Sequence, residues 1–247
     1  MAFKIIYEPK GRAKEYGDLA LNIYNGCSFG CTYCFAPMVL KKDRETFHKI
    51  IRQRENFLQK VERDCQLDLF EDRRVHLCFT CDPYQDIDLE LELTREVLKL
   101  FKKYNINFKI LTKGGLRAAR DFDLYKPGDS FGSTLTFLND FDSDEWEPNA
   151  PDPVLRHAAL RMAHMKGIKT WVSLEPVIDP EQSLDIIKAT HTFVDFYKIG
   201  TINYNDRKKE IDWKDFGTKA IELLEGYGKE YYIKEDLRKA MEVPNAK

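Results

Sequence analysis

The chain has 247 residues, a formal net charge of −2 and 43% hydrophobic residues. This composition is typical of a globular protein and excludes a disordered or low-complexity chain. The near-neutral charge gives no overall basic surface for nucleic acid, although it allows a local basic face. No stretch approaches the roughly 20 apolar residues that cross a bilayer, and the N-terminus has no apolar secretory core. We therefore expect a cytoplasmic protein with no membrane partner, whose thiols stay reduced.

Short apolar or alternating segments are predicted as six strands in chain order. They are residues 19–23, 75–79, 107–111, 131–137, 170–174 and 194–199. Helical patterns separate them, at residues 94–104, 153–166, 183–191 and 214–227. The charged segment 41–64 is predicted as a further helix with one apolar side. Strands and helices in series indicate an α/β fold with a parallel sheet and right-handed crossovers.

The most informative feature is a C-x3-C-x2-C run made by Cys27, Cys31 and Cys34. In a reducing compartment, three thiols in one short loop indicate a metal site rather than disulfides. A [4Fe–4S] cluster normally takes four cysteines, so three local ligands leave one iron open to a small molecule. Gly26 and Gly30 suit a loop that folds tightly around such a cluster.

The alternative is a structural zinc site, which needs four protein ligands and would be completed by Cys65, Cys78 or a histidine. Cys78 and Cys81 form a separate C-x2-C pair. Because side chains alternate along a strand, these two cysteines are expected to point in opposite directions. A second metal site is therefore not expected there. Cys65 lies in a charged stretch and is assigned no role.

The cysteine run, with Tyr33 and Phe35 around its last member, resembles the signature of the radical S-adenosylmethionine (SAM) superfamily. The resemblance implies a partial (β/α)6 TIM-type barrel with the cluster loop after the first strand. It implies one domain over 1–247, with a barrel core at about 18–205 and a helical extension at 206–247. In that superfamily a [4Fe–4S] cluster cleaves SAM reductively to a 5′-deoxyadenosyl radical, which takes hydrogen from a substrate. It also implies an external electron donor, flavodoxin- or ferredoxin-like.

Four further segments resemble one branch of the superfamily, the spore photoproduct lyase-like proteins. They are Asp82-Pro83-Tyr84-Gln85, Thr94-Arg95, Thr112-Lys113 and Arg120-Asp121. Two departures argue against a genuine spore photoproduct lyase. The hydrogen-donating cysteine of those enzymes is replaced by Phe79 here, and the tyrosine after the last cluster cysteine is replaced by Phe35. The reaction, of lyase or oxidoreductase type, therefore stays open.

The same resemblance implies the residues that surround SAM. Lys113 is expected to bind the SAM carboxylate, and Glu175 to lie near the adenosine. Cys81 is expected to be either a SAM contact or a relay that returns a hydrogen atom, with a small buried residue as the alternative. The full set is Tyr33, Phe35, Thr80, Cys81, Asp82, Lys113, Thr134, Thr136 and Glu175. For Lys113 the alternative is a lysine exposed to solvent in a loop. For Thr134 and Thr136 it is a role in strand formation alone. For Glu175 it is capping of the next helix or pairing with an arginine.

The substrate is unknown from sequence, with nucleic acid or a nucleotide lesion as the leading candidate and a peptide or small metabolite behind it. Arg117 and Arg120 would either meet phosphates or pair with Asp121 and Asp123. The tail 231–241 is expected to close the open side of the barrel. The alternative class is a non-catalytic iron–sulfur protein, an electron carrier or structural module. It is disfavoured because a carrier needs neither the barrel nor the SAM-like positions.

Overall fold

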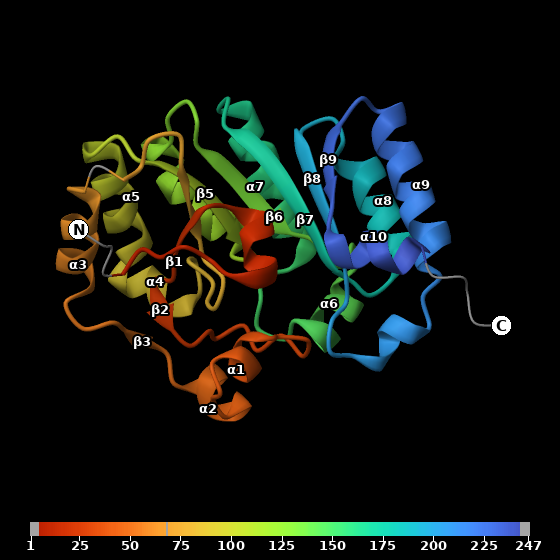
Figure 1. Ribbon diagram of the computed structural model, residues 1–247, viewed down its shortest axis with the longest axis horizontal. Helices are drawn as coiled ribbons and strands as arrows, with labels where there is room; N and C mark the ends of the chain where they lie inside the picture. Colours follow the sequence, from red (N-terminus) through yellow and green to blue (C-terminus); the bar gives the residue numbers. More distant parts are fainter. Residues whose placement is uncertain (1–4, 68, 243–247) are drawn as a thin grey trace.

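The computed structural model describes residues 5–67 and 69–242. Its centre is one parallel sheet with the strand order β1-β4-β5-β6-β7-β8-β9 (Figure 1). The strands are β1 (Leu19–Leu21), β4 (Arg74–Leu77), β5 (Asn107–Thr112), β6 (Ser130–Thr134), β7 (Lys169–Val177), β8 (Phe196–Thr201) and β9 (Glu230–Ile233). Every neighbouring pair is parallel, so each connection is a crossover. The predicted α/β fold with parallel strands is confirmed.

All six predicted strands are present, and a seventh follows them in the chain. The sequence pattern does not predict β9, because its four residues include only one buried side chain, that of Ile233. The strand lies between α9 (Trp213–Gly226) and α10 (Glu235–Glu242). The predicted helical extension at 206–247 is therefore wrong at this point, since part of it joins the sheet. Residues 243–247 lie outside the described part of the chain.

The four helices that the sequence pattern predicts between strands are confirmed and pack against the sheet. In α5 (Leu93–Lys103), the buried Val97, Leu98 and Phe101 recur at helical spacing. The helix α7 (Pro153–Met165) begins with proline, and α8 (Pro180–Thr190) does the same. The remaining short elements are α4 (Asp86–Leu91), α6 (Asp140–Trp146), η1 (Gly11–Tyr16), η2 (Gly115–Leu124) and η3 (Asp206–Lys209). No helix within the described residues is long and apolar enough to span a bilayer.

The single helix predicted over 41–64 is wrong. The segment holds, in chain order, α2 (Arg44–Lys49), β3 (Arg52–Gln53) and α3 (Phe57–Cys65). Pairing of β3 with β2 (Tyr24–Asn25) interrupts the helical run, and Asn56 has a left-handed φ of 50° before α3. A Cβ added to Gly26 would lie 2.7 Å from the carbonyl oxygen of Ile50, so the two segments cross closely. The break places α2 beside α1 (Ala36–Val39) (Figure 1).

Several side chains of the sheet pack around the buried Trp171. The indole is 1% exposed and lies against Gly132 on the neighbouring strand β6. The Lys109 ammonium lies 4.0 Å from the indole centroid, and the His76 ring centroid lies 6.3 Å away. Burial lowers the pKa of His76 well below its ordinary value and that of Lys109 to about 8. The interior is therefore packed around these groups.

Gly132→Ala tests this packing. A Cβ at Gly132 would lie 2.2 Å from Trp171 Cε2, so the substitution must displace a buried indole. We expect the free energy of unfolding, measured by urea denaturation, to fall by about 1–3 kcal/mol or more. The matched control is Gly226→Ala at the end of α9, where no atom lies within 4 Å of the added Cβ. Its effect should stay within about 1 kcal/mol, and equal losses in the two variants would contradict the close contact.

Candidate functional site

Three thiols on one loop line a cavity of about 540 Å³ at the carboxyl ends of the strands. Cys27, Cys31 and Cys34 follow β2 in residues 26–35, which we call the cysteine loop. Gly26 and Gly30 have φ angles of 91° and 66°. Glycine adopts such left-handed angles without a steric penalty, so the loop turns tightly as expected.

Hydrogen bonds from neighbouring segments hold the backbone of the cysteine loop. The Arg44 guanidinium donates to the carbonyl oxygens of the second and third cysteines. His48 Nδ1 donates to the carbonyl oxygen of the first cysteine over 2.8 Å. On another side, Gln85 Oε1 accepts the Ser28 N–H at 2.8 Å. These contacts involve backbone atoms of the loop, and none of the three cysteines is in a disulfide.

The donor set fits the predicted cluster. Burial raises the pKa of all three loop thiols, that of Cys31 to about 11, so thiolates here need a positive group beside them. Iron would supply such charge, and three thiolates lining one cavity would leave one iron of a [4Fe–4S] cluster without a protein ligand. In residues 5–67 and 69–242, no three His, Cys, Asp or Glu side chains are grouped to hold a single metal ion. Cys65 lies at the end of α3 and does not line the cavity.

The cavity brings together most of the residues predicted to surround SAM. It is lined by Tyr33, Phe35, Thr80, Cys81, Asp82, Lys113, Thr134 and Glu175. Thr136 is not brought there, because its hydroxyl faces Glu147, with 3.2 Å between Oγ1 and Oε1. The lining residues come from distant parts of the chain, since the carboxyl ends of parallel strands meet at one edge.

The Asp82 carboxylate is fully engaged by the protein. Oδ1 accepts the Tyr84 N–H at 2.9 Å and the Thr112 hydroxyl at 2.6 Å, and Oδ2 accepts the Lys113 N–H at 2.8 Å. Burial raises the pKa of Asp82, although these donors oppose the rise. The carboxylate therefore ties the segment after β4 to the end of β5 and fixes the backbone of Lys113.

A buried ion pair that no sequence motif marks lies beside the cysteine loop. The side chains of Glu147 and Arg156 are both 0% exposed and are paired. The Tyr33 hydroxyl also donates to Glu147, and Lys113 Nζ lies 3.7 Å from Glu147 Oε1. Burial by itself raises the pKa of Glu147, but Arg156 and Lys113 outweigh it and hold that pKa below its ordinary value. Glu147 thereby fixes the Tyr33 ring and holds the Lys113 ammonium at one side of the cavity.

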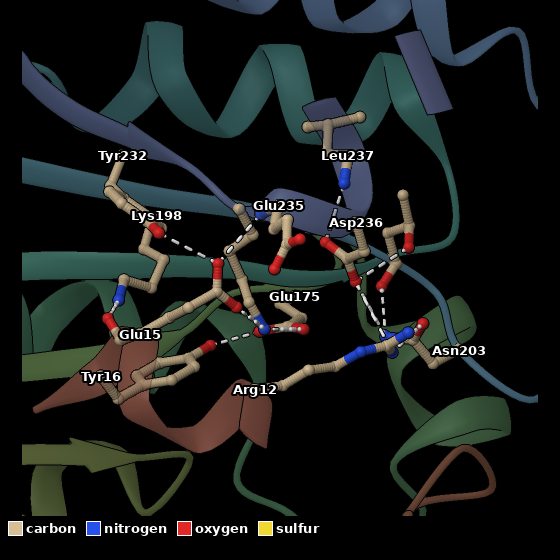
Figure 2. Close-up of polar contacts among 12 residues, drawn as sticks. Arg12, Glu15, Tyr16, Glu175, Lys198, Asn203, Tyr232, Glu235, Asp236 and Leu237 are labelled. Atoms are coloured by element: carbon tan, nitrogen blue, oxygen red, sulfur yellow. Dashed lines mark hydrogen bonds and ion pairs between the residues drawn. The ribbon is translucent and has the colours of Figure 1, made fainter. Parts of the chain in front are cut away.

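The segment η1 and the residue after β9, which lie near the two ends of the described chain, also line the cavity, and Figure 2 shows the polar contacts between these segments. Tyr16 on η1 donates to the Glu175 carboxylate, and Lys234, directly after β9, lies 2.5 Å from Glu175 Oε1. Figure 2 also shows Arg12 reaching Asn203 Oδ1, at 2.6 Å. Burial raises the pKa of Tyr16 well above its ordinary value, so its hydroxyl stays a donor. Tyr16 and Lys234 stand in no motif, and Lys234 reaches the site only because β9 joins the sheet.

Cys78 and Cys81 lie together, and the expectation that they point in opposite directions is wrong. Strand alternation does not apply to them because β4 ends at Leu77 and the chain bends through residues 79–81. Burial, and after it the neighbouring Cys81, raises the pKa of Cys78 well above its ordinary value. Both are buried, and both line the cavity. Phe79 lines it as well.

The two arginines that follow Lys113 in the chain are paired with carboxylates. Arg117 lies 2.6 Å from Asp86, and Arg120 pairs with Asp88 and lies 3.5 Å from Asp121. Both arginines therefore pair with carboxylates, which was one of the two predicted alternatives. Of the expected partners only Asp121 is used, and Asp86 and Asp88 are additional. Neither arginine lines the cavity.

Glu147→Gln tests the buried ion pair. The substitution leaves Arg156 buried without an anionic partner, so we expect the free energy of unfolding at pH 7 to fall by about 3–5 kcal/mol. Urea denaturation measures this loss. The matched control is Glu145→Gln, two residues away and exposed, which should change it by less than about 0.5 kcal/mol. A Glu147→Gln variant as stable as the control would contradict the role of the pair.

The loss of stability in Glu147→Gln should also depend on pH. The pKa of Glu147 is lower in the folded protein than its unfolded value of about 4.3, so its stabilisation is complete above that value. It is lost as the pH falls through the folded-state pKa. The stability difference between wild type and Glu147→Gln should therefore shrink in acid, when both are unfolded by urea at a series of pH values. A difference that stays constant down to the acid limit would contradict a depressed pKa.

Comparison with known proteins agrees with this geometry. The family model of the Radical SAM superfamily matches residues 21–194. An uncharacterised protein of Methanocaldococcus jannaschii is 29% identical over 192 residues, covering 74% of this chain and 70% of the relative. An uncharacterised protein of Acidianus two-tailed virus is 28% identical over 200 residues, covering 75% of this chain and 65% of the relative.

Two kinds of solved structure share the fold. A mutant of spore photoproduct lyase with bound AdoMet and dinucleoside spore photoproduct has a TM-score of 0.71 and 13% identity, covering 92% of this chain and 78% of that one. Streptococcus suis SuiB bound to S-adenosylmethionine has a TM-score of 0.64 and 11% identity, covering 87% and 46%. At these identities the likeness shows the fold alone, which is the predicted partial barrel. Because the family model matches most of the chain, this protein belongs to the radical SAM superfamily.

Proposed function

We propose that this protein is an enzyme that holds a [4Fe–4S] cluster on Cys27, Cys31 and Cys34 and cleaves SAM. The observation that carries the proposal is one cavity lined by three free thiols and eight of the nine residues expected around SAM. When bound, the cluster supplies one electron to the SAM sulfonium, which gives methionine and a 5′-deoxyadenosyl radical. The cavity volume of about 540 Å³ falls within the range of small-molecule sites.

Lys113 is proposed to bind the SAM carboxylate. Its side chain is 15% exposed and its Nζ lies 5.3 Å from the Tyr33 ring centroid. Burial lowers the pKa of Lys113, but Cys31 and Glu147 outweigh burial and keep the ammonium charged. A charge-assisted hydrogen bond to a carboxylate is stronger than a neutral one, especially in a cavity with little water. Asp82 acts as a positioning residue, since it fixes the backbone of Lys113.

Glu175 is proposed to lie near the adenosine. Tyr16 and Lys234 already hold its carboxylate, so it is oriented before any ligand enters. Thr80 and Thr134 supply hydroxyl groups to the same cavity, and Tyr33 and Phe35 supply rings beside the last cluster cysteine. Thr136 is proposed to act through Glu147 instead.

Cys81 is proposed to contact SAM or to return a hydrogen atom to a product radical. Its sulfur accepts the Tyr24 N–H over 3.4 Å, and the residue is 8% exposed and lines the cavity. The two roles differ in what Cys81→Ala changes. A contact residue changes the affinity for SAM, whereas a relay changes the fate of the hydrogen and leaves the affinity intact.

The substrate proposed first is nucleic acid or a nucleotide. The cavity reaches Lys10, Arg12 and Tyr204, which is 73% exposed, and these groups suit a phosphate and the face of a base. A flavodoxin- or ferredoxin-like protein is proposed as the electron donor, in a cytoplasmic setting. The second candidate function is a non-catalytic iron–sulfur protein, which the same three thiols would also suit.

Reductive cleavage of SAM separates these two functions. Anaerobic reconstitution with iron and sulfide, followed by dithionite and SAM, should give 5′-deoxyadenosine, measured by liquid chromatography. Cys31→Ala should lose both the cluster absorbance and the cleavage, because it removes one of three iron ligands. Cys65→Ala is the matched control and should keep both, since that thiol lies outside the cavity. An intact wild-type cluster that yields no 5′-deoxyadenosine would favour the electron carrier.

Lys113→Met tests the carboxylate contact. Loss of a hydrogen bond to a charged group costs about 1.5–3 kcal/mol, so the dissociation constant for SAM should rise about 10- to 150-fold. Anaerobic calorimetric titration of SAM into the cluster-loaded protein measures this constant. Lys99→Met, on the exposed side of α5, is the control and should leave it unchanged. Unaltered affinity in Lys113→Met, with the cluster intact, would remove Lys113 from the SAM site.

A further inference from the structure

The segment that follows the cysteine loop is basic, although the chain as a whole is not. Residues 35–54 hold six basic and two acidic side chains, which gives this segment a charge of +4 in a chain of −2. Both carboxylates are used within the segment, since Asp43 caps the N-terminus of α2 and Glu45 pairs with Lys49. Lys41 and Lys42 are exposed, and neither forms an ion pair with any residue in the described part of the chain.

Exposed apolar side chains stand directly beside these two lysines. Met38 and Leu40 are 51% and 41% exposed, and Val39 between them is exposed as well and reaches the edge of the cavity. We call these five residues, 38–42, the α1–α2 surface, because α1 and α2 lie side by side and project from the sheet here (Figure 1). An apolar centre with a charged rim is typical of a protein–protein interface, whereas a nucleic-acid surface is more polar and more positively charged throughout.

The α1–α2 surface lies where the cysteine loop reaches the exterior. Cys34 is half-buried and stands one residue before α1, and Arg44 on α2 donates to the carbonyl oxygens of Cys31 and Cys34. Backbone hydrogen bonds of 2.8 and 3.2 Å to residues 146–149 cover the other part of the loop, at residues 29–32. The remaining side of the loop faces the cavity. A protein that approaches the loop from outside therefore meets α1 and α2.

We propose that the α1–α2 surface is the docking site of the electron donor, and that this donor is a small electron-transfer protein with an acidic surface around its redox group. The inference rests on the proposed function, because that function is what requires a donor. Lys41 and Lys42 attract the acidic partner, and Met38 and Leu40 supply the apolar contact. One electron leaves the reduced carrier and enters the cluster, so the carrier is oxidised by one electron and no bond is broken.

Binding of the carrier is measured without turnover. An oxidised flavodoxin, and separately an acidic [2Fe–2S] ferredoxin, is titrated calorimetrically into the cluster-loaded protein at low ionic strength and without SAM or oxygen. Lys41→Glu/Lys42→Glu replaces two attractions by two repulsions, so the dissociation constant of the carrier that binds should rise about tenfold or more. Added salt should weaken binding to the wild type and reduce the difference between the two proteins.

The matched control is Arg161→Glu/Lys166→Glu, which changes two exposed positions along and at the end of α7. Both double variants lower the net charge of the chain by four, so the control removes any effect of total charge. Its dissociation constant should stay within about twofold of the wild-type value. Cluster absorbance and circular dichroism should match the wild type in both variants. Equal losses in the two variants, unaltered affinity in Lys41→Glu/Lys42→Glu, or binding of neither carrier to the wild type would overturn the proposal.

The source of the electron separates this proposal from the proposed function. Dithionite is small and needs no docking site, so Lys41→Glu/Lys42→Glu should form 5′-deoxyadenosine from SAM at the wild-type rate with dithionite. With flavodoxin kept reduced by its reductase and NADPH, and present below saturation, the rate should fall about tenfold, in proportion to the lost affinity. Equal rates with flavodoxin would overturn the docking site and leave the cleavage intact. A wild-type protein that forms no product with dithionite would overturn the proposed function instead, and the calorimetric titration would still decide whether the surface binds the carrier.

Discussion

The convergence of parallel strands on one edge of the sheet is the constraint on which the whole site depends. The cysteine loop follows β1 and β2, Lys113 follows β5, Glu175 lies in β7 and Lys234 follows β9. No two of these groups are close in the sequence, yet all line one cavity because every strand ends at the same side. A strand added or lost therefore changes the cavity, as β9 shows by supplying Lys234.

The charges around the cavity are paired before any ligand is present. Glu147 is held by Arg156 and faces Lys113, and Glu175 is held by Tyr16 and Lys234. Buried charges are costly unless they are paired in this way. The pairing also fixes the direction of each group, so a bound cofactor meets dipoles and charges that need little rearrangement. The cost of burial is thus met within the protein, and the site is preorganised.

The strands, most helices and the cysteine loop follow from local patterns, since each depends on residues adjacent in the chain. The break in 41–64 does not, because it arises from pairing of β3 with β2 and from the close approach at Gly26. Strand alternation failed at Cys81 because it holds only within a strand, and β4 ends at Leu77. Glu147 carries no motif, and its importance comes from a partner nine residues away that the fold turns toward it.

The central claim is that the cysteine loop leaves one iron of a cluster open to SAM. The most direct test is the electron paramagnetic resonance spectrum of the dithionite-reduced, cluster-loaded protein, recorded with and without SAM. We predict that addition of SAM changes the g-values and line shape, because a ligand enters the coordination of that iron. An intact cluster whose spectrum is the same with and without saturating SAM would contradict the claim.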